Sequence, residues 1–167
     1  AAAGTPARLL VGPWSHQSAR SARPGPHLDL TAEMVRWFDR WLRDVHNGVD
    51  TEPPVVYFRR TFTTPDPDTP VLNGDWQAEP GWPASRVREE PHPLPPGERV
   101  HVVRAGTGTA AWNSCAGALP WGQPTDQRFD DAASLRYEFP VQAPGLELLG
   151  CPRLRLRLAA DRPVANV

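Results

Sequence analysis

His16 is the residue whose type and position most clearly allow chemistry. It closes the segment Gly12-Pro13-Trp14-Ser15-His16, which follows a short apolar run at residues 7–11. That run predicts a strand buried on both faces, as in a parallel sheet, which ends at the proline. A histidine in the loop after such a strand can act as a general base, because imidazole titrates near neutral pH. On spacing alone, a role limited to hydrogen bonding is the more common one.

The other potentially reactive side chains predict no metal or cofactor site. Ser15 adjoins His16, and neighbouring loop residues seldom align as nucleophile and base. Cys115 and Cys151 form no C-x-x-C pair, so a zinc site and a disulfide scaffold are both unsupported. The remaining histidines show no ligand spacing: His27, His46, His92 and His101.

Two sets of carboxylates have structural explanations. Asp29 follows His16 and fits the approach to a helix. A charged cluster lacks the glycine that a calcium loop needs, so it predicts a salt-bridged turn. Its members are Asp126, Arg128, Asp130 and Asp131.

Residues 31–45 predict an amphipathic helix. Its apolar residues recur at helical spacing: Met34, Trp37, Phe38, Trp41, Leu42 and Val45. The opposite face offers two i,i+4 ion pairs, Asp39 with Arg43 and Arg40 with Asp44. Thr31 is the expected N-cap, and Asn47-Gly48 is the expected stop. A stripe that includes two tryptophans needs a large apolar surface to cover it.

A change of pattern follows the Glu52-Pro53-Pro54 segment. Short runs at residues 55–58, 99–103, 135–139 and 153–158 predict strands, and the loops between them are rich in Pro and Gly. In the last run, leucine alternates with arginine, as in a strand with one wet face. Such spacing predicts a β-sandwich or jelly-roll.

Composition excludes several classes of protein. The 167 residues carry a net charge of −1, so no basic excess points to a nucleic-acid partner. No apolar run reaches the length of a membrane span, and no secretory signal is visible, which slightly favours the cytoplasm and leaves the location open. The only methionine is Met34 and the sequence opens at Ala1, so we expect a piece of a longer protein.

Several motifs in order resemble the X-Pro dipeptidyl-peptidase and cocaine-esterase family of α/β-hydrolases. The resemblance covers nearly the whole chain. The motifs that carry it are Gly12-Pro13-Trp14-Ser15-His16, Trp37-Phe38-Asp39-Arg40-Trp41-Leu42, Asn47-Gly48-Val49-Asp50, Pro53-Pro54-Val55, Trp76, Trp82-Pro83, Pro124-Thr125-Asp126-Gln127-Arg128 with Asp130-Asp131, Leu135, and Leu149-Gly150 before the last strand.

The resemblance implies a mixed fold in two parts. Residues 1–50 would be the C-terminal segment of an α/β-hydrolase domain, comprising a strand, the histidine loop and a helix. Residues 51–167 would be a mostly β jelly-roll sandwich, truncated at its end. An upstream hydrolase portion is then an expected partner, and a homo-oligomer is a further possibility.

The resemblance also implies a Ser-His-Asp triad with His16 as its base, acting on a peptide or ester substrate. In α/β-hydrolases the serine and the acid precede the histidine. The residues before His16 contain no Asp or Glu, and the sequence has no Gly-x-Ser-x-Gly elbow. We therefore expect this chain alone to be inactive, with His16 as its only catalytic residue.

Two alternatives remain open. The chain can be a non-catalytic jelly-roll module that binds sugar or peptide through Trp112 and Trp121. It can also be a complementing subunit whose serine and aspartate come from a separate chain.

Overall fold

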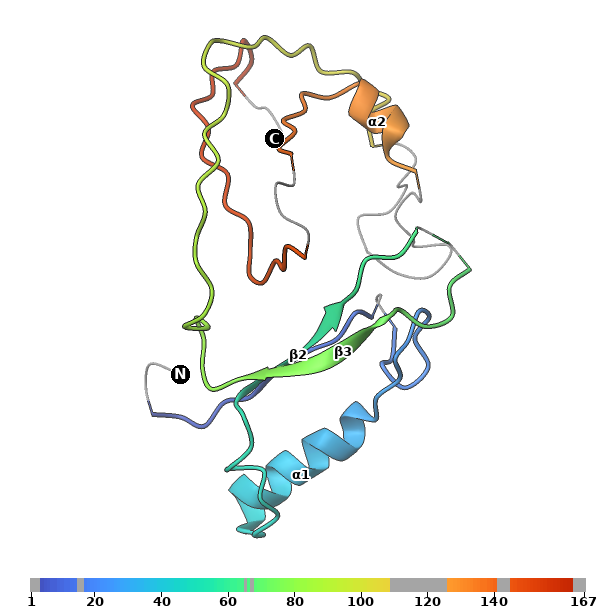
Figure 1. The fold of residues 1–167 in the computed structure, drawn as a ribbon, viewed down its shortest axis with the longest axis vertical. Coiled ribbons are helices and arrows are strands. Elements are labelled where there is room, and N and C mark those ends of the chain that lie inside the picture. Colours follow the sequence, from blue (N-terminus) through green and yellow to red (C-terminus); the bar gives the residue numbers. More distant parts are fainter. Residues whose placement is uncertain are drawn as a thin grey trace. The chain divides into compact units, whose positions relative to one another are not determined.

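The computed structural model describes residues 4–14, 17–64, 66, 68–108, 126–140 and 145–163. Its elements are, in order, β1 (Leu9–Val11), α1 (Leu30–Arg43), β2 (Val55–Arg60), β3 (Gly74–Glu79) and α2 (Arg128–Ala132) (Figure 1). The chain divides into two compact units, Ala1–Tyr137 and Glu138–Val167. All five elements belong to the first unit.

The three strands form one mixed sheet in the order β1-β2-β3. β1 runs parallel to β2, with Leu9 opposite Val55, and β2 runs antiparallel to β3, with Val55 opposite Glu79. The strands predicted at residues 7–11 and 55–58 are confirmed as β1 and β2. The prediction that β1 is buried on both faces is wrong, since Leu9 and Val11 are 45% and 47% exposed. In the described sheet β1 pairs along one edge only, and these two residues remain about half exposed.

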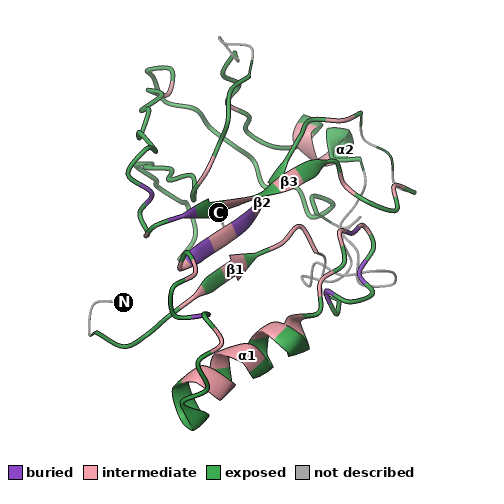
Figure 2. Ribbon diagram, turned by 60° about the horizontal axis from the view of Figure 1, so that its bottom comes forward, coloured by how far each residue is buried: buried purple, intermediate pink, exposed green. Residues whose placement is uncertain are grey.

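The buried apolar residues of the described chain are few, and all but Tyr57 are small (Figure 2). Val55 and Tyr57 alternate along β2 and therefore point to one face of the sheet. Ala19 and Ala22 form a separate buried pair in the loop before α1. Val49 and Ala84 are the other members.

Helix α1 begins and ends slightly earlier than predicted. Asp29, not Thr31, is the N-cap, and its Oδ1 accepts a hydrogen bond from the backbone N–H of Ala32 at 3.1 Å. A carboxylate in this position also interacts favourably with the helix dipole. Asp44 takes the left-handed conformation at the other end, with φ 56°, so the helix stops before Asn47-Gly48.

Both predicted ion pairs of α1 are confirmed. Arg43 Nη1 lies 2.7 Å from Asp39 Oδ1, and Arg40 Nη1 lies 2.5 Å from Asp44 Oδ1. The predicted apolar stripe faces outward: no residue of α1 is buried, and Leu42 is 76% exposed. The sequence predicts that a large apolar surface covers this stripe, and the described residues provide no such surface.

The later predicted strands do not form. Residues 99–103, 135–139 and 153–158 adopt no regular structure. Alternation indicates which face a strand would bury, but a strand also needs a neighbour to complete its hydrogen bonds. β3 was not predicted, because Gly74–Glu79 is mostly polar; its pairing with β2 creates it. The described sheet fits a β-rich domain, and none of the described helices is long and apolar enough to cross a membrane.

Candidate functional site

The loop between β1 and α1, residues 12–29, contains the candidate base. Ser15 and His16 themselves lie outside the described residues. The structure instead defines the chain on either side of them, Gly12–Trp14 before and Gln17 onward. The sequence-based assignment of His16 therefore stays a prediction, and the structure shows the contacts that hold the chain before and after it.

Trp14 anchors the chain before residue 16. Its indole Nε1 donates a hydrogen bond to the carbonyl oxygen of Pro26 at 2.6 Å. Its ring also meets Trp76 of β3, with ring centroids 6.0 Å apart. Trp76 in turn meets Phe58 of β2 edge-on at 5.4 Å. The loop is thereby attached to both antiparallel strands through aromatic side chains, an attachment that the sequence did not predict.

Gly12 provides the space that Trp14 occupies. A Cβ at residue 12 would lie 2.5 Å from carbons of the Trp14 six-membered ring, closer than real Cβ atoms approach other heavy atoms. The absence of a side chain at residue 12 thus lets the indole fold back over the backbone. This steric restriction explains why residue 12, two residues before the tryptophan, is a glycine.

A tight turn anchors the chain after residue 16. The carbonyl of Ser18 accepts hydrogen bonds from the backbone N–H groups of Ser21 at 2.9 Å and Ala22 at 2.8 Å. His27 Nε2 lies 3.0 Å from the carbonyl oxygen of Ala22, which only accepts, so this nitrogen is the donor. His27 therefore has a structural role in the loop.

A short bridge joins the same loop to the β2–β3 connection. Gly25 donates its N–H to the carbonyl of Pro70 at 2.8 Å, and its own carbonyl accepts from the N–H of Leu72 at 3.0 Å. Gly25 and Val71 thus pair as an isolated parallel bridge. Segments on both sides of residues 15 and 16 are consequently held to the β2–β3 hairpin.

An ion network fixes the start of β1, helix α1 and the start of β2 to one another. Arg8 contacts Glu33 at 3.1 Å and Glu52 at 2.7 Å. Arg36 contacts the same two carboxylates, Glu33 at 3.2 Å and Glu52 more closely. The hydrogen bond to Glu52 raises the pKa of Arg36 above its ordinary value. This network connects α1 to the chain before β1 and to the chain before β2, although none of the described residues covers the apolar face of the helix.

The segment that follows α1 is held in a similar way. Asn47 Nδ2 donates to the carbonyl of Arg36 at 2.7 Å, and its Oδ1 accepts from the N–H of Val49 at 3.2 Å. Arg40 Nε donates to Asp50 Oδ2 at 2.7 Å, which lowers the pKa of Asp50. Asn47, predicted as part of the helix stop, therefore ties the connection back to the helix.

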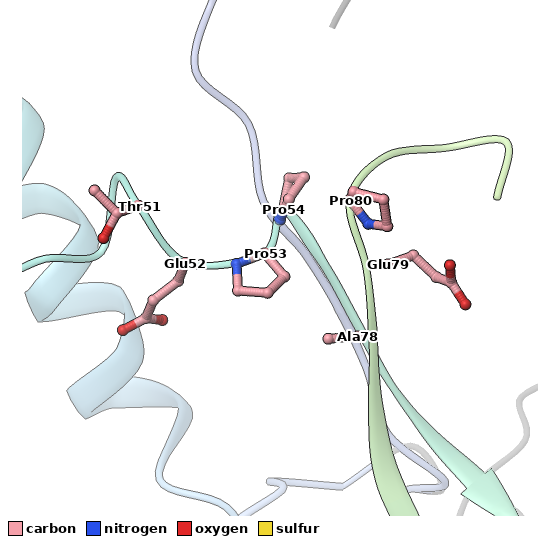
Figure 3. Close-up of a pocket in the computed structure, with 7 residues that line it drawn as sticks. All are labelled: Thr51, Glu52, Pro53, Pro54, Ala78, Glu79 and Pro80. Atoms are coloured by element: carbon pink, nitrogen blue, oxygen red, sulfur yellow. The ribbon is translucent and has the colours of Figure 1, made fainter. Parts of the chain in front are cut away.

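A pocket of about 370 Å³ lies at the other end of the sheet (Figure 3). Its lining residues are Thr51, Glu52, Pro53, Pro54, Ala78, Glu79 and Pro80. Glu79 is opposite Val55 at the beginning of β2, whereas the loop of residues 12–29 leaves the opposite end of β1. The pocket is therefore not part of the histidine loop.

The two carboxylates of this pocket are already engaged by arginines. Glu52 belongs to the ion network, and the buried Glu79 accepts from Arg86 Nε at 2.6 Å. Tyr57, whose hydroxyl also contacts both Glu79 and Arg86, completes a polar cluster in which Tyr57 and Glu79 are buried and Arg86 is exposed. These contacts stabilise the hairpin and leave the pocket without an evident catalytic group.

The remaining predicted residues have structural roles or lie outside the described chain. Asp29 caps α1, so it is committed to the helix. The predicted charged cluster contains a salt bridge between Asp126 and Arg128 at 2.5 Å, which lowers the pKa of Asp126 to about 2, whereas Asp130 and Asp131 lie in helix α2 and not in a turn. The described residues contain no group of histidine, cysteine and carboxylate side chains suited to a metal ion. Outside the described residues lie Trp112, Cys115 and Trp121.

The sequence of this chain is similar to a known protein family and to two known proteins. Residues 47–167 match the X-Pro dipeptidyl-peptidase C-terminal non-catalytic domain. Two curated proteins, from Mycobacterium bovis and Mycobacterium tuberculosis, are each named as a putative serine esterase; each is 29% identical over 159 residues, covering 85% of this chain. The same span is 24% of each relative, so the chain covers about a quarter of the length of these relatives. No solved structure matches.

Proposed function

The chain belongs to the family of X-Pro dipeptidyl-peptidase C-terminal non-catalytic domains, and on this premise we propose that it is the C-terminal part of a serine hydrolase. The observation that carries the proposal is the similarity to two proteins named as serine esterases. That similarity covers a larger share of the chain than the family match does, so it extends before residue 47. The family match supports a non-catalytic role for residues 47–167, and the catalytic contribution is then expected upstream of them.

In this proposal His16 is the catalytic base. It takes the proton of a serine hydroxyl as that oxygen attacks the substrate carbonyl, and then gives the proton to the leaving group. An aspartate holds the imidazole in the required tautomer. The serine and the aspartate come from a hydrolase portion that lies outside this chain. The order strand, histidine loop and helix in β1, residues 12–29 and α1 supports this role.

The proposed architecture keeps a boundary near residue 50. Residues 1–50 belong to an α/β-hydrolase domain, and residues 51–167 belong to a jelly-roll. The uncovered apolar stripe of α1 supports the first assignment, since a helix of that composition is normally packed against a sheet. The β2–β3 hairpin and the family match support the second.

An ester is the first substrate to test, because the relatives' names specify esterases. The experiment compares the 167-residue chain with a longer polypeptide in which an α/β-hydrolase portion precedes it. We expect the longer protein to hydrolyse p-nitrophenyl acetate and the chain alone to show only the background rate. A longer protein without activity on this ester, and on an X-Pro p-nitroanilide as the peptide alternative, would contradict the proposal.

The split-hydrolase alternative makes a different prediction for the same assay. There, mixing the separately purified chain and hydrolase portion restores turnover without a covalent link. The binding-module alternative is favoured by the description of residues 47–167 as non-catalytic. It predicts retention on a glycan array that is lost when Trp112 or Trp121 is replaced by alanine, with no turnover in any form of the protein.

A further inference from the structure

We infer that Trp76 is a positioning residue for the base, acting through Trp14 on the chain that leads to His16. The inference rests on the proposed function, in which His16 is the base. It also gives the family domain a part in catalysis, because Trp76 lies within the residues that match a domain described as non-catalytic.

Trp76 lies in β3, within the antiparallel part of the described sheet. It lies opposite Phe58 in the antiparallel β2–β3 ladder, and the two rings contact edge-on at 5.4 Å. Gly74, with φ 156°, leaves the space that Phe58 uses: a Cβ there would lie 2.7 Å from the Phe58 ring and 2.1 Å from the Arg59 carbonyl oxygen. The Phe58 ring therefore packs against the backbone of β3 at Gly74, and the Trp76 ring packs against Phe58.

Trp14 is held from three directions. Gly12 lies beneath its six-membered ring, Pro26 accepts its indole hydrogen bond, and Trp76 contacts its ring at a centroid distance of 6.0 Å. The first two contacts lie within the loop itself. Trp76 is the contact that joins the indole directly to a strand, so removing its ring frees the indole on that side.

The position of Trp14 matters because His16 is the second residue after it. A general base must hold its nitrogen within hydrogen-bond reach of the nucleophile, and a misplacement of about 1 Å can cost about 100-fold in rate. Replacement of Trp76 by alanine is therefore expected to lower kcat about 10- to 100-fold, while KM, which reports other substrate contacts, changes less than about twofold.

The structural part of the test uses the 167-residue chain with ¹⁵N-labelled tryptophan. We expect Trp76→Ala to reduce the hydrogen-exchange protection of the Trp14 indole N–H at least tenfold, and Trp76→Phe to keep most of it. Trp82→Ala, which removes a half-exposed tryptophan of the same domain, is the matched control and should have no effect. Unchanged protection in Trp76→Ala would overturn the inference.

A second variant covers the case in which Trp76→Ala does not fold. Gly12→Ala displaces the Trp14 indole from its other side without changing β3. We expect it to lower the protection of the indole N–H and, in the longer hydrolase, kcat. A folded Gly12→Ala protein with wild-type kcat would also overturn the inference.

The kinetic part of the test uses the longer hydrolase with p-nitrophenyl acetate. Trp76→Ala should lower kcat with little change in KM. Trp76→Phe should lower the logarithm of kcat by no more than half as much as Trp76→Ala does. If His16→Ala has no effect, the proposed function fails while the exchange result still stands. If His16→Ala removes activity and Trp76→Ala has wild-type kcat, only the positioning role fails.

Discussion

The indole of Trp14 and the carbonyl of Pro26 close the histidine loop with a hydrogen bond of 2.6 Å. The bond joins residues that lie on opposite sides of the predicted base. It therefore restricts the loop more directly than a contact at either end alone.

Trp14→Phe keeps an aromatic ring but removes this donor. The part-buried Pro26 carbonyl then loses its partner, which costs about 1 to 3 kcal/mol of unfolding free energy. Urea unfolding followed by far-ultraviolet circular dichroism measures the effect. Trp82→Phe is the control and should shift the midpoint little; equal shifts in the two variants would argue against a special role for the Trp14 bond.

Two glycines of the chain make a matched pair for a test of packing. A Cβ at Gly12 would lie 2.5 Å from the Trp14 ring, whereas a Cβ at Gly81 would have nothing within 4 Å. Gly12→Ala should destabilise the chain by about 1 to 3 kcal/mol through this overlap. Gly81→Ala should change stability by no more than about 0.5 kcal/mol. The prediction is wrong if thermal melts rank the variants in the reverse order.

Glu52 connects two arginines from different elements, Arg8 before β1 and Arg36 in α1. Glu52→Gln should lower stability by at most about 1 kcal/mol, because these partly exposed pairs are screened by solvent. The loss should shrink as salt is raised, because salt screens the wild-type pairs. Asp161→Asn, which removes an exposed pair with Arg162, should leave the midpoint unchanged at every salt concentration. A Glu52→Gln effect independent of salt would point to packing instead.

Asp126 should titrate at unusually low pH. The hydrogen bond from Arg128 lowers the pKa of this carboxyl to about 2. Since the folded pKa is below the unfolded value near 3.9, the pair stabilises the fold above about pH 4 and loses this effect as pH falls toward 2. A ¹³C carboxyl titration by NMR measures the shift directly. Arg128→Gln should return the pKa toward 3.9; a wild-type value already there would refute the ion pair.

Local pattern was enough to predict the elements whose interactions are local. Helix α1 follows from the 3.6-residue spacing of its apolar residues, and its ion pairs Asp39–Arg43 and Arg40–Asp44 follow from their i,i+4 separation. The sequence predicts the N-cap at Thr31 and the structure has it at Asp29, because both residue types are good caps and the sequence alone does not choose between them. The strand runs 7–11 and 55–58 are predicted from their apolar residues, although the pairing of β1 with β2 is a long-range interaction.

Long-range partners were not predictable in the same way. β3 exists because Gly74–Glu79 pairs with β2, and nothing in its own polar sequence indicates a strand. The contact of Trp14 with Trp76 joins residues far apart in the chain, so spacing could not reveal it. Conversely, the alternating run at residues 153–158 has the pattern of a strand, but it pairs with no strand in the part of the chain that the structure describes. His16 is predicted to be the catalytic base because it lies in the loop after a strand and because its segment resembles the family motif.

The rate of the His16→Ala variant tests the central claim most directly. The measurement is kcat/KM for p-nitrophenyl acetate in the longer hydrolase, with His101→Ala as a control that removes an exposed histidine of the same chain. Loss of the base of a serine triad should lower kcat/KM by about 10³-fold or more, whereas His101→Ala should retain wild-type activity. A fall of less than about tenfold in His16→Ala, in a protein that remains folded, would contradict the assignment of His16 as the catalytic base.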